Sequence, residues 1–213
     1  MIHDLLRCYE ERRAEIEARL AEFHRIGQEG DDEAWFLELA YCLLTPQARG
    51  RNAWQTVERL RATGLLWKGT VADLEPEMHL VRFRRKARYL VAAREQFQDV
   101  RGRIRIRERL LPLLQDPADA RRWLVRRIPG MGYKEASHFL RNIGFGDTLA
   151  ILDRHILRYL VQYGVIPALP RSLTPRRYEA IEHEMRAFAA RLGLPLAHLD
   201  LLLWSLATGE VFK

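Results

Sequence analysis

The sequence predicts an all-α protein built as two helical lobes. Apolar residues recur at the three- and four-residue spacing of helices almost throughout the chain. Glycines and prolines interrupt this pattern beside residues that cap helices, and no long segment alternates apolar with polar residues. Short β structure is considered only around Ile104–Ile106. The 213 residues, 48% of them hydrophobic, are expected to form one unit, residues 1–213, with a sizeable core.

The expected helices begin and end at recognisable signals. Asp31 or Asp32 can cap a helix that stops at Thr45-Pro46, and Asp116-Pro117 reads as an N-cap followed by proline at the first helical position. Gly27 is expected to end the first helix. The predicted helices cover 1–26, 33–44, 48–62, 83–100, 117–127, 133–143, 153–163, 175 up to the glycine at 193, and 195–207.

The composition favours a polyanionic partner and argues against a membrane or secreted protein. The formal net charge is +7. No apolar run approaches the roughly 20 residues of a membrane span, and the charged start of the chain does not resemble a signal peptide. Cys8 and Cys42 are too few for an iron–sulfur cluster or a structural zinc, so we interpret them as reduced core residues.

Lysine is scarce in this chain. Only Lys68, Lys86, Lys134 and Lys213 are lysine among 35 basic residues. Arginine cannot give up its proton at ordinary pH, whereas lysine can become a free amine nucleophile. Each lysine is therefore a candidate for chemistry.

The most informative stretch is a predicted helical hairpin at about 117–143. Its turn, Ile128–Gly132, reads IPGMG, and Gly130 and Gly132 allow a tight backbone turn between two helices. The second helix would begin with exposed N–H groups, which can bind a phosphate without reading base sequence. A plain corner between two helices explains the turn equally well.

Lys134 and Asp153 are unusual for their positions. Lys134 lies in the first turn of the second helix, where the helix dipole disfavours a cation and favours the neutral amine that nucleophilic catalysis needs. A lysine that only contacts phosphate is the alternative. Asp153 shares an apolar helical face with Ile156, Leu157 and Leu160, so its carboxylate must cap the helix, be paired, or take part in chemistry.

These residues lie within longer matching blocks. The segments Gly132–Asn142 (GYKEASHFLRN) and Asp153–Arg158 (DRHILR) resemble the helix-hairpin-helix DNA glycosylase superfamily, most closely its second-type 8-oxoguanine DNA glycosylase/lyases, known mainly from archaea and some thermophilic bacteria. Endonuclease III and the adenine glycosylases usually carry four cysteines near the carboxyl terminus, and alkyl-base glycosylases lack the lysine. Further matching blocks are Leu44–Gln47, Val81–Phe83 with Lys86-Ala87, and Asp200–Lys213.

The resemblance implies a mechanism. A nucleotide is flipped into a pocket between the lobes, Lys134 attacks the sugar to release 8-oxoguanine through a Schiff base, and β-elimination cleaves the abasic strand. Asp153 would stabilise the developing charge. The implied partner is double-stranded DNA that contains 8-oxoguanine or abasic sites, bound by a monomeric, cytoplasmic, nucleoid-associated prokaryotic enzyme. No cofactor or side-chain metal site is expected, apart from a monovalent cation held by hairpin backbone carbonyls.

The resemblance also implies roles for residues outside the hairpin. Gln47 would enter the duplex, and Arg82 with Phe83 would lie by the orphaned partner base, although Arg82 could contact only phosphate and Phe83 could be core. Trp204 would stack on the extruded base, although a tryptophan among leucines is otherwise most often a core residue. Lys213 would help to read the lesion, with a frayed tail as the alternative.

Two other functions stay open at the level of sequence. The same fold could excise another damaged base, or the chain could be a helix-hairpin-helix module that binds DNA without catalysis. Its length, far beyond one motif, and the Lys134/Asp153 pair argue against the second.

Overall fold

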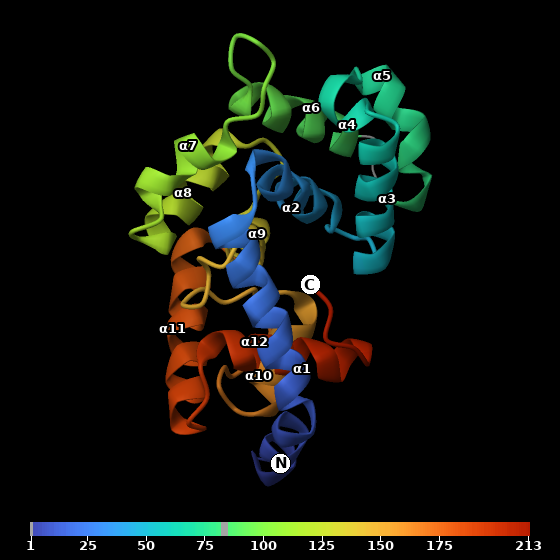
Figure 1. Cartoon of the computed structure of the whole chain (residues 1–213). Helices are drawn as coiled ribbons and strands as arrows, with labels where there is room; N and C mark the ends of the chain where they lie inside the picture. Colours follow the sequence, from blue (N-terminus) through green and yellow to red (C-terminus); the bar gives the residue numbers. More distant parts are fainter. Residues whose placement is uncertain (1, 82–84) are drawn as a thin grey trace.

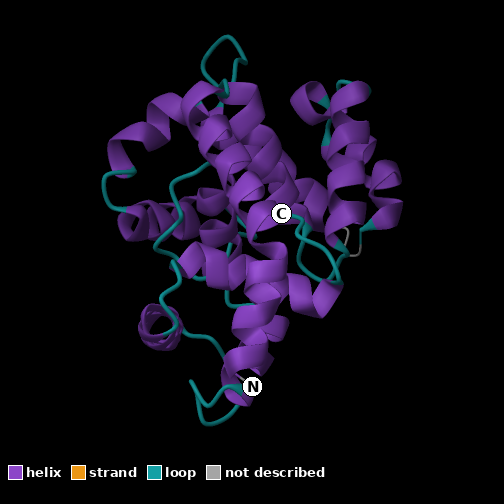
Figure 2. Ribbon diagram, turned by 60° about the horizontal axis from the view of Figure 1, so that its bottom comes forward, coloured by secondary structure: helices purple, strands orange, loops and turns teal. Residues whose placement is uncertain are grey.

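The computed structural model describes residues 2–81 and 85–213, and these residues are helical with no β-strand (Figures 1 and 2). The predicted all-α class is therefore confirmed. The elements are α1 Ile2–Glu29, α2 Asp32–Leu44, α3 Gly50–Ala62, α4 Leu65–Lys68, α5 Val71–Leu74, the 3₁₀ helix η1 Glu75–Leu80, α6 Arg85–Phe97, α7 Ile106–Leu110, the 3₁₀ helix η2 Leu111–Leu113, α8 Pro117–Arg127, α9 Tyr133–Asn142, α10 Arg154–Gln162, α11 Pro175–Arg191 and α12 Leu196–Thr208.

Two clusters of buried residues form the two lobes. One draws on α2 to α9, and the other on α1 together with α10, α11 and α12. Figure 1 shows the first lobe above the second, with α9 between them. The first helix of the chain thus packs with the last ones. The chain passes from the first cluster to the second between Leu149 and Ala150, three residues before Asp153.

The predicted end of α1 at Gly27 is wrong, because the helix continues to Glu29. Gly27 is buried, and a Cβ at this position would lie 2.2 Å from the carbonyl oxygen of Ile143. The glycine lets α1 approach the end of α9 closely instead of stopping the helix.

The short β structure considered around Ile104–Ile106 is not formed. The described residues contain one isolated bridge there, between Gln98 and Ile104. Ile106 is instead the buried first residue of α7. Asp32 accepts a hydrogen bond (2.8 Å) from the backbone N–H of Arg107, which fixes the start of this helix. The short helices α4, α5, α7, η1 and η2 were not predicted, since each is too brief to show a period.

The remaining boundaries agree with the sequence to within a few residues. Asp31 and Asp116 cap α2 and α8 as predicted. Cys42 is a buried core thiol, whereas Cys8 on α1 is only half-buried. In the part of the chain that the structure describes, no single helix is long and apolar enough to cross a membrane. Only α11 and α12 taken together pass that test, and they are bent by 96°.

Candidate active site

A cleft of about 1020 Å³ is lined by residues of both lobes, mainly from the segment 45–51 that joins α2 to α3, from α9, from the start of α10, from α12 and from the C-terminal tail. Five residues that the sequence singled out line it: Gln47, Lys134, Asp153, Trp204 and Lys213. The structure therefore brings together positions up to 166 residues apart in the chain. Gly130 and Gly132 lie on the hairpin outside the lining, and Arg82 and Phe83 lie outside the described residues.

Lys134 is the second residue of α9, and its side chain is mostly buried. Its Nζ donates a hydrogen bond to Oγ1 of Thr45 (3.3 Å) and lies 3.0 Å from a carboxylate oxygen of Glu135. Thr45 directly follows α2, so the contact joins two elements that are far apart in the sequence. The amine is held at the wall of the cleft by one hydroxyl and one carboxylate.

The hairpin turn between α8 and α9 is fixed from two sides. The N–H of Met131 donates to the carbonyl of Ile128 (3.2 Å), and Glu135 accepts from the N–H of Gly132 (3.1 Å). Gly130 has φ +83°, and a Cβ there would lie 2.2 Å from the ring of Tyr89 on α6. Glu135 thus occupies the N–H of Gly132, whereas the N–H groups of Tyr133, Lys134 and Glu135 have no side-chain acceptor and are available to an anion.

Asp153 is the N-cap of α10. Its Oδ1 accepts hydrogen bonds from the backbone N–H groups of His155 (2.7 Å) and Ile156 (2.8 Å). Its Oδ2 makes no hydrogen bond or ion pair with any described residue. One oxygen thus fixes the carboxylate, and the other remains available in the cleft. The sequence left capping, pairing and chemistry open, and the structure shows the cap.

Buried side chains hold the extended segment that leads into Asp153. The N–H groups of Ala150, Ile151 and Leu152 donate to Glu182 (2.8 Å), Asp200 (2.8 Å) and the hydroxyl of Tyr178 (3.0 Å), respectively. The same hydroxyl donates to the carbonyl of Ala150 (2.7 Å). Three consecutive amides are therefore bound by side chains of α11 and α12, which leaves the Asp153 backbone little freedom.

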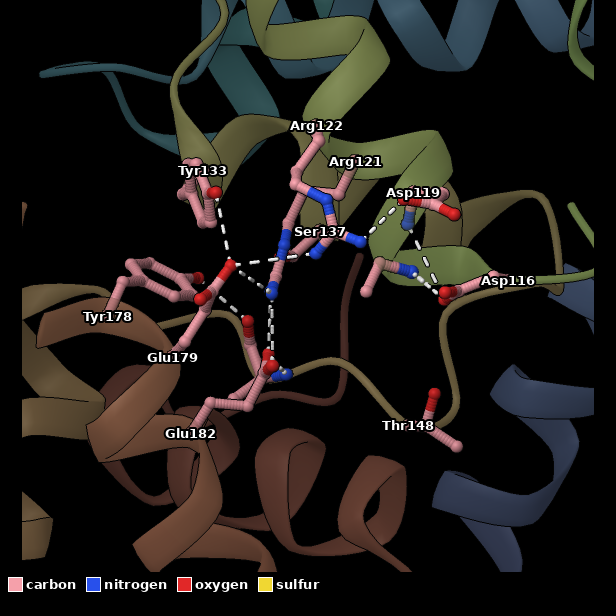
Figure 3. Close-up of polar contacts among 12 residues, drawn as sticks. Asp116, Asp119, Arg121, Arg122, Tyr133, Ser137, Thr148, Tyr178, Glu179 and Glu182 are labelled. Atoms are coloured by element: carbon pink, nitrogen blue, oxygen red, sulfur yellow. Dashed lines mark hydrogen bonds and ion pairs between the residues drawn. The ribbon is translucent and has the colours of Figure 1, made fainter. Parts of the chain in front are cut away.

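Glu182 is in turn paired with Arg121 of the hairpin helix α8 (Figure 3). Two guanidinium nitrogens contact the two carboxylate oxygens at 2.7 and 3.1 Å, and one of them also donates to Ser137 (3.2 Å). The guanidinium lies over the rings of Tyr133 and Tyr178. Both ions are almost completely buried. This bidentate pair fixes α8 of one lobe against α11 of the other.

Two further charged side chains line the cleft. Arg141, on the Lys134 face of α9, and Asp200 of α12 lie 3.8 Å apart. Burial raises the pKa of Asp200 to about 7, while the Arg141 charge and the hydrogen bond from Ile151 work against this rise. Burial lowers the pKa of Arg141, and the Asp200 charge opposes this shift. The attraction between Arg141 and Asp200 therefore only partly offsets the cost of burying both charges.

The Gln47 loop is held by a buried lysine. Nζ of Lys86 on α6 donates to the carbonyls of Leu44 and Pro46, each at 2.6 Å. Burial, with a smaller contribution from the nearby Lys134, lowers the pKa of Lys86 to about 8. Gln47 is exposed and is the one described non-glycine residue with a positive φ, at 55°. The loop thus holds Gln47 in a conformation that side chains rarely adopt.

A family model described as 8-oxoguanine DNA glycosylase matches residues 16–194. The chain belongs to this family. It is 42% identical over 212 residues to the 8-oxoguanine DNA glycosylase/AP lyase of Fusobacterium nucleatum, covering 99% of this chain and 97% of the relative. The enzyme of that name from Korarchaeum cryptofilum is 36% identical, with 100% and 98% covered. The predicted resemblance to the archaeal-type branch is thus confirmed.

A solved structure of the family has the same fold. The 8-oxoguanine glycosylase/lyase of Methanocaldococcus jannaschii, in complex with 15mer DNA containing 8-oxoguanine, superimposes with a TM-score of 0.86. The identity is 34%, with 98% of this chain and 99% of that chain covered. The glycosylase of Thermotoga maritima gives a TM-score of 0.83 at 32% identity, with 100% and 98% covered.

Two residues expected to contact the base in this 8-oxoguanine DNA glycosylase family member differ in their surroundings. Trp204 is half-buried and lines the cleft, while the leucines beside it pack in the core. The Lys213 ammonium does not project into open space. It contacts Glu38 (2.6 Å) and lies 3.2 Å from the centroid of the Trp54 ring. The lysine side chain therefore anchors the tail to the α2 and α3 lobe.

Sequence reasoning missed several residues of this glycosylase cleft. Thr45 was noted only as part of a matching block. His138 and Arg141 lie four and seven residues after Lys134, so the helical period could have placed them on the Lys134 face of the helix. His138 was noted only as part of the matching block Gly132–Asn142, with no role of its own. Asp200 carries no such signal, because only the tertiary fold brings it to the cleft.

Proposed function

We propose that this chain is an 8-oxoguanine DNA glycosylase/AP lyase that acts on double-stranded DNA containing 8-oxoguanine or abasic sites. The observation that carries the proposal is the cleft shared by the Lys134 amine and the free oxygen of the Asp153 cap. The family, the relatives' names and the DNA complex of the M. jannaschii enzyme support it.

The residues support the following sequence of steps. The damaged nucleotide leaves the helix and enters the cleft. Glu135, 3.0 Å away, takes the proton of the Lys134 ammonium, and the free amine attacks the anomeric carbon. The bond from this carbon to the base breaks, and the base leaves with the electron pair and takes up a proton. The nitrogen of Lys134 then loses a proton, and its lone pair expels the ring oxygen of the sugar, which takes up a proton. The sugar ring opens and a protonated Schiff base forms. The free oxygen of Asp153 faces the positive charge that develops on the sugar.

The lyase step follows from the Schiff base. The iminium carbon acidifies the adjacent C–H group of the sugar, so loss of that proton expels the 3′ phosphate. Water then releases Lys134 from the unsaturated sugar. Strand cleavage therefore needs no second nucleophile.

The rest of the DNA interface is also part of the proposal. The free N–H groups of α9, next to Gly130 and Gly132, bind a phosphate, and Gln47 enters the duplex. Arg82 and Phe83, which lie outside the described residues, are proposed to contact the orphaned base. Pro129 and Gly130 are exposed at the turn, which fits a monovalent cation on backbone carbonyls there. Among the described residues, no group of three or more His, Cys, Asp or Glu could hold a metal ion.

Residues 1–213 are proposed to act as one catalytic unit of two lobes. A DNA substrate would place this unit with the nucleoid of a prokaryotic cell.

The test of the proposed function is Lys134→Gln. The variant keeps a side chain of similar length and a hydrogen-bond donor to Thr45, but it cannot form a Schiff base. We expect it to lose both 8-oxoguanine release and the borohydride-trapped adduct, while its affinity for DNA stays within about threefold of wild type. Trapping on an 8-oxoguanine duplex, followed by denaturing gel electrophoresis, measures the adduct.

Lys68→Gln is the matched control, since Lys68 is exposed outside the cleft and the variant should still give a trapped adduct. A wild-type yield of adduct in Lys134→Gln would show that Lys134 is not the nucleophile. A wild-type protein that forms no adduct and releases no base would contradict the proposed function itself.

A further inference from the structure

His138 is a buried side chain without a partner in the candidate active site. It lies one helical turn after Lys134 on α9, lines the same cleft, and is only 7% exposed. Neither ring nitrogen forms a full hydrogen bond with a described residue, and the backbone of Lys213 lies near one of them without the geometry of such a bond. Among the described residues, two other buried side-chain atoms have no hydrogen-bond partner, one in Glu77 and one in Arg121. Both of these side chains form ion pairs, Glu77 with Arg59 and Arg121 with Glu182.

An unpartnered buried imidazole destabilises a fold, because the ring loses its bonds to water and gains none in return. A side chain kept in this state is therefore expected to have a partner that the free protein lacks. The surroundings restrict what that partner is. Tyr41 meets the ring edge-on, with centroids 5.5 Å apart, so the ring is fixed in orientation.

The charges around His138 keep the ring neutral. Burial lowers its pKa well below the usual value, and the cations Arg141, Lys134 and Lys213 lower it further. A neutral imidazole has one N–H donor and one acceptor nitrogen. The backbone of Lys213 lies close enough to favour a proton on the ring. With the proton on the nitrogen nearer Lys213, the other nitrogen is left as an acceptor.

A lone acceptor suits an uncharged partner with N–H groups. Phosphate would be bound by the cations in the cleft and would be repelled by the lone pair of His138. The extruded base is uncharged and planar, and 8-oxoguanine carries N–H groups at N1, at the 2-amino group and at N7. Trp204 lines the same cleft and offers an aromatic surface.

We propose that His138 is a specificity residue of the base subsite, whose unprotonated ring nitrogen accepts a hydrogen bond from an N–H group of the extruded base. This inference rests on the proposed function. It assigns His138 to base release and leaves strand cleavage at a preformed abasic site to Lys134 and Asp153.

The test compares His138→Leu, which removes the acceptor, with His138→Gln, which retains one. We expect the leucine variant to excise 8-oxoguanine about tenfold or more slowly in single turnover, and the glutamine variant to recover most of the rate. Cleavage of a duplex with a preformed abasic site should change much less, because no base has to be bound. The Tm of His138→Leu should equal or exceed that of wild type, since an unpartnered polar group has been removed.

His198→Leu is the matched control. His198 is half-buried and lies outside the cleft, and its ring nitrogen is hydrogen-bonded to Tyr9 (2.9 Å). This variant should show the opposite pattern, with a lower Tm and wild-type excision. His138→Met serves as a second apolar variant should the leucine variant fold poorly.

Substrate analogues identify the N–H group involved. Duplexes with 8-oxoinosine lack the 2-amino group, and duplexes with 8-oxo-7-deazaguanine lack the N7–H. If loss of one N–H group from the base slows excision by wild type but does not further slow excision by His138→Leu, that N–H group is the donor to His138. If neither deletion couples to His138, N1–H is the remaining donor, and His138→Leu must still show the selective loss of base release.

Two results overturn the inference. One is excision by His138→Leu at the wild-type rate, and the other is an equal loss of base release and abasic-site cleavage. Both are distinct from failure of the proposed function, in which wild-type protein itself releases no 8-oxoguanine.

Discussion

At the scale of the residue, Lys134 and Asp153 could be found from the sequence because each is at odds with its local surroundings. A lysine at a helix start and an acid on an apolar helical face need an explanation within a few residues of chain. Their partners could not be found this way. Thr45 lies 89 residues before Lys134 and meets it only because α2 packs on α9. The division of Asp153 into a capping oxygen and a free one likewise depends on coordinates.

The separate roles of the two Asp153 carboxylate oxygens predict how the variant Asp153→Asn behaves. The asparagine oxygen can still accept the bonds from His155 and Ile156, so the Tm should stay within a few degrees of wild type. Excision should fall about 100- to 1000-fold, since the negative charge beside the sugar is lost. Thermal unfolding and single-turnover base release measure the two effects.

Asp116→Asn provides the comparison for this variant. Asp116 is also an N-cap, but it is exposed on α8 and does not line the cleft. It should change the Tm to a similar extent and leave excision unaffected. If Asp153→Asn excised 8-oxoguanine at nearly the wild-type rate, Asp153 would serve only as the N-cap of α10.

At the scale of the element, capping and helical period predicted the long helices, since both signals are local. They failed where tertiary packing decides the outcome. α1 continues through Gly27 because the close contact with Ile143 requires a glycine there. The loop 45–49 could be recognised as a break, but not its bracing by Lys86, which comes from a helix 40 residues later.

The buried ammonium of Lys86 predicts a pH dependence of stability. Its pKa in the folded protein is about 8, below the ordinary value of 10.5, so the unfolded chain holds this proton more tightly. Burying the charged form destabilises the fold below pH 8, and this penalty is relieved as the pH rises from 8 towards 10.5. Relative to Lys86→Met, wild type should gain about 1–3 kcal/mol in free energy of unfolding between about pH 7 and pH 10.

Urea unfolding of both proteins across this range measures the gain. If the free energies of unfolding of wild type and Lys86→Met change with pH in parallel, burial does not destabilise the Lys86 ammonium.

At the scale of the whole molecule, the sequence predicted two helical lobes, but the pairing of α1 with the last helices could not be derived from periodicity. The net charge of +7, in contrast, follows from the sequence, and the structure shows where part of this charge lies. Arg49, Arg51 and Arg154 line the cleft together with the candidate catalytic residues. A cationic cleft should attract any duplex, damaged or not.

Binding to undamaged duplex should therefore weaken linearly in log affinity against log salt, with a slope of about −0.9 for each phosphate neutralised. Arg154→Gln should reduce the magnitude of this slope by about 1. Arg109→Gln, on α7 and outside the cleft, should leave it unchanged. Fluorescence anisotropy over a salt series measures the slopes, and a flat response in wild type would argue against a phosphate-binding cleft.

The side chains that hold residues 150–152 bear on the genetics of this repair activity. Tyr178 and Glu182 lie on α11 and do not line the cleft, yet they bind the backbone that carries Asp153. A screen for mutator alleles should therefore recover substitutions on this helix, in cells whose glycosylase still accumulates and still binds DNA. Such alleles would resemble substitutions of Asp153 itself. A second substitution, at Arg121, is expected to suppress those alleles that leave the buried Arg121 charge unpaired.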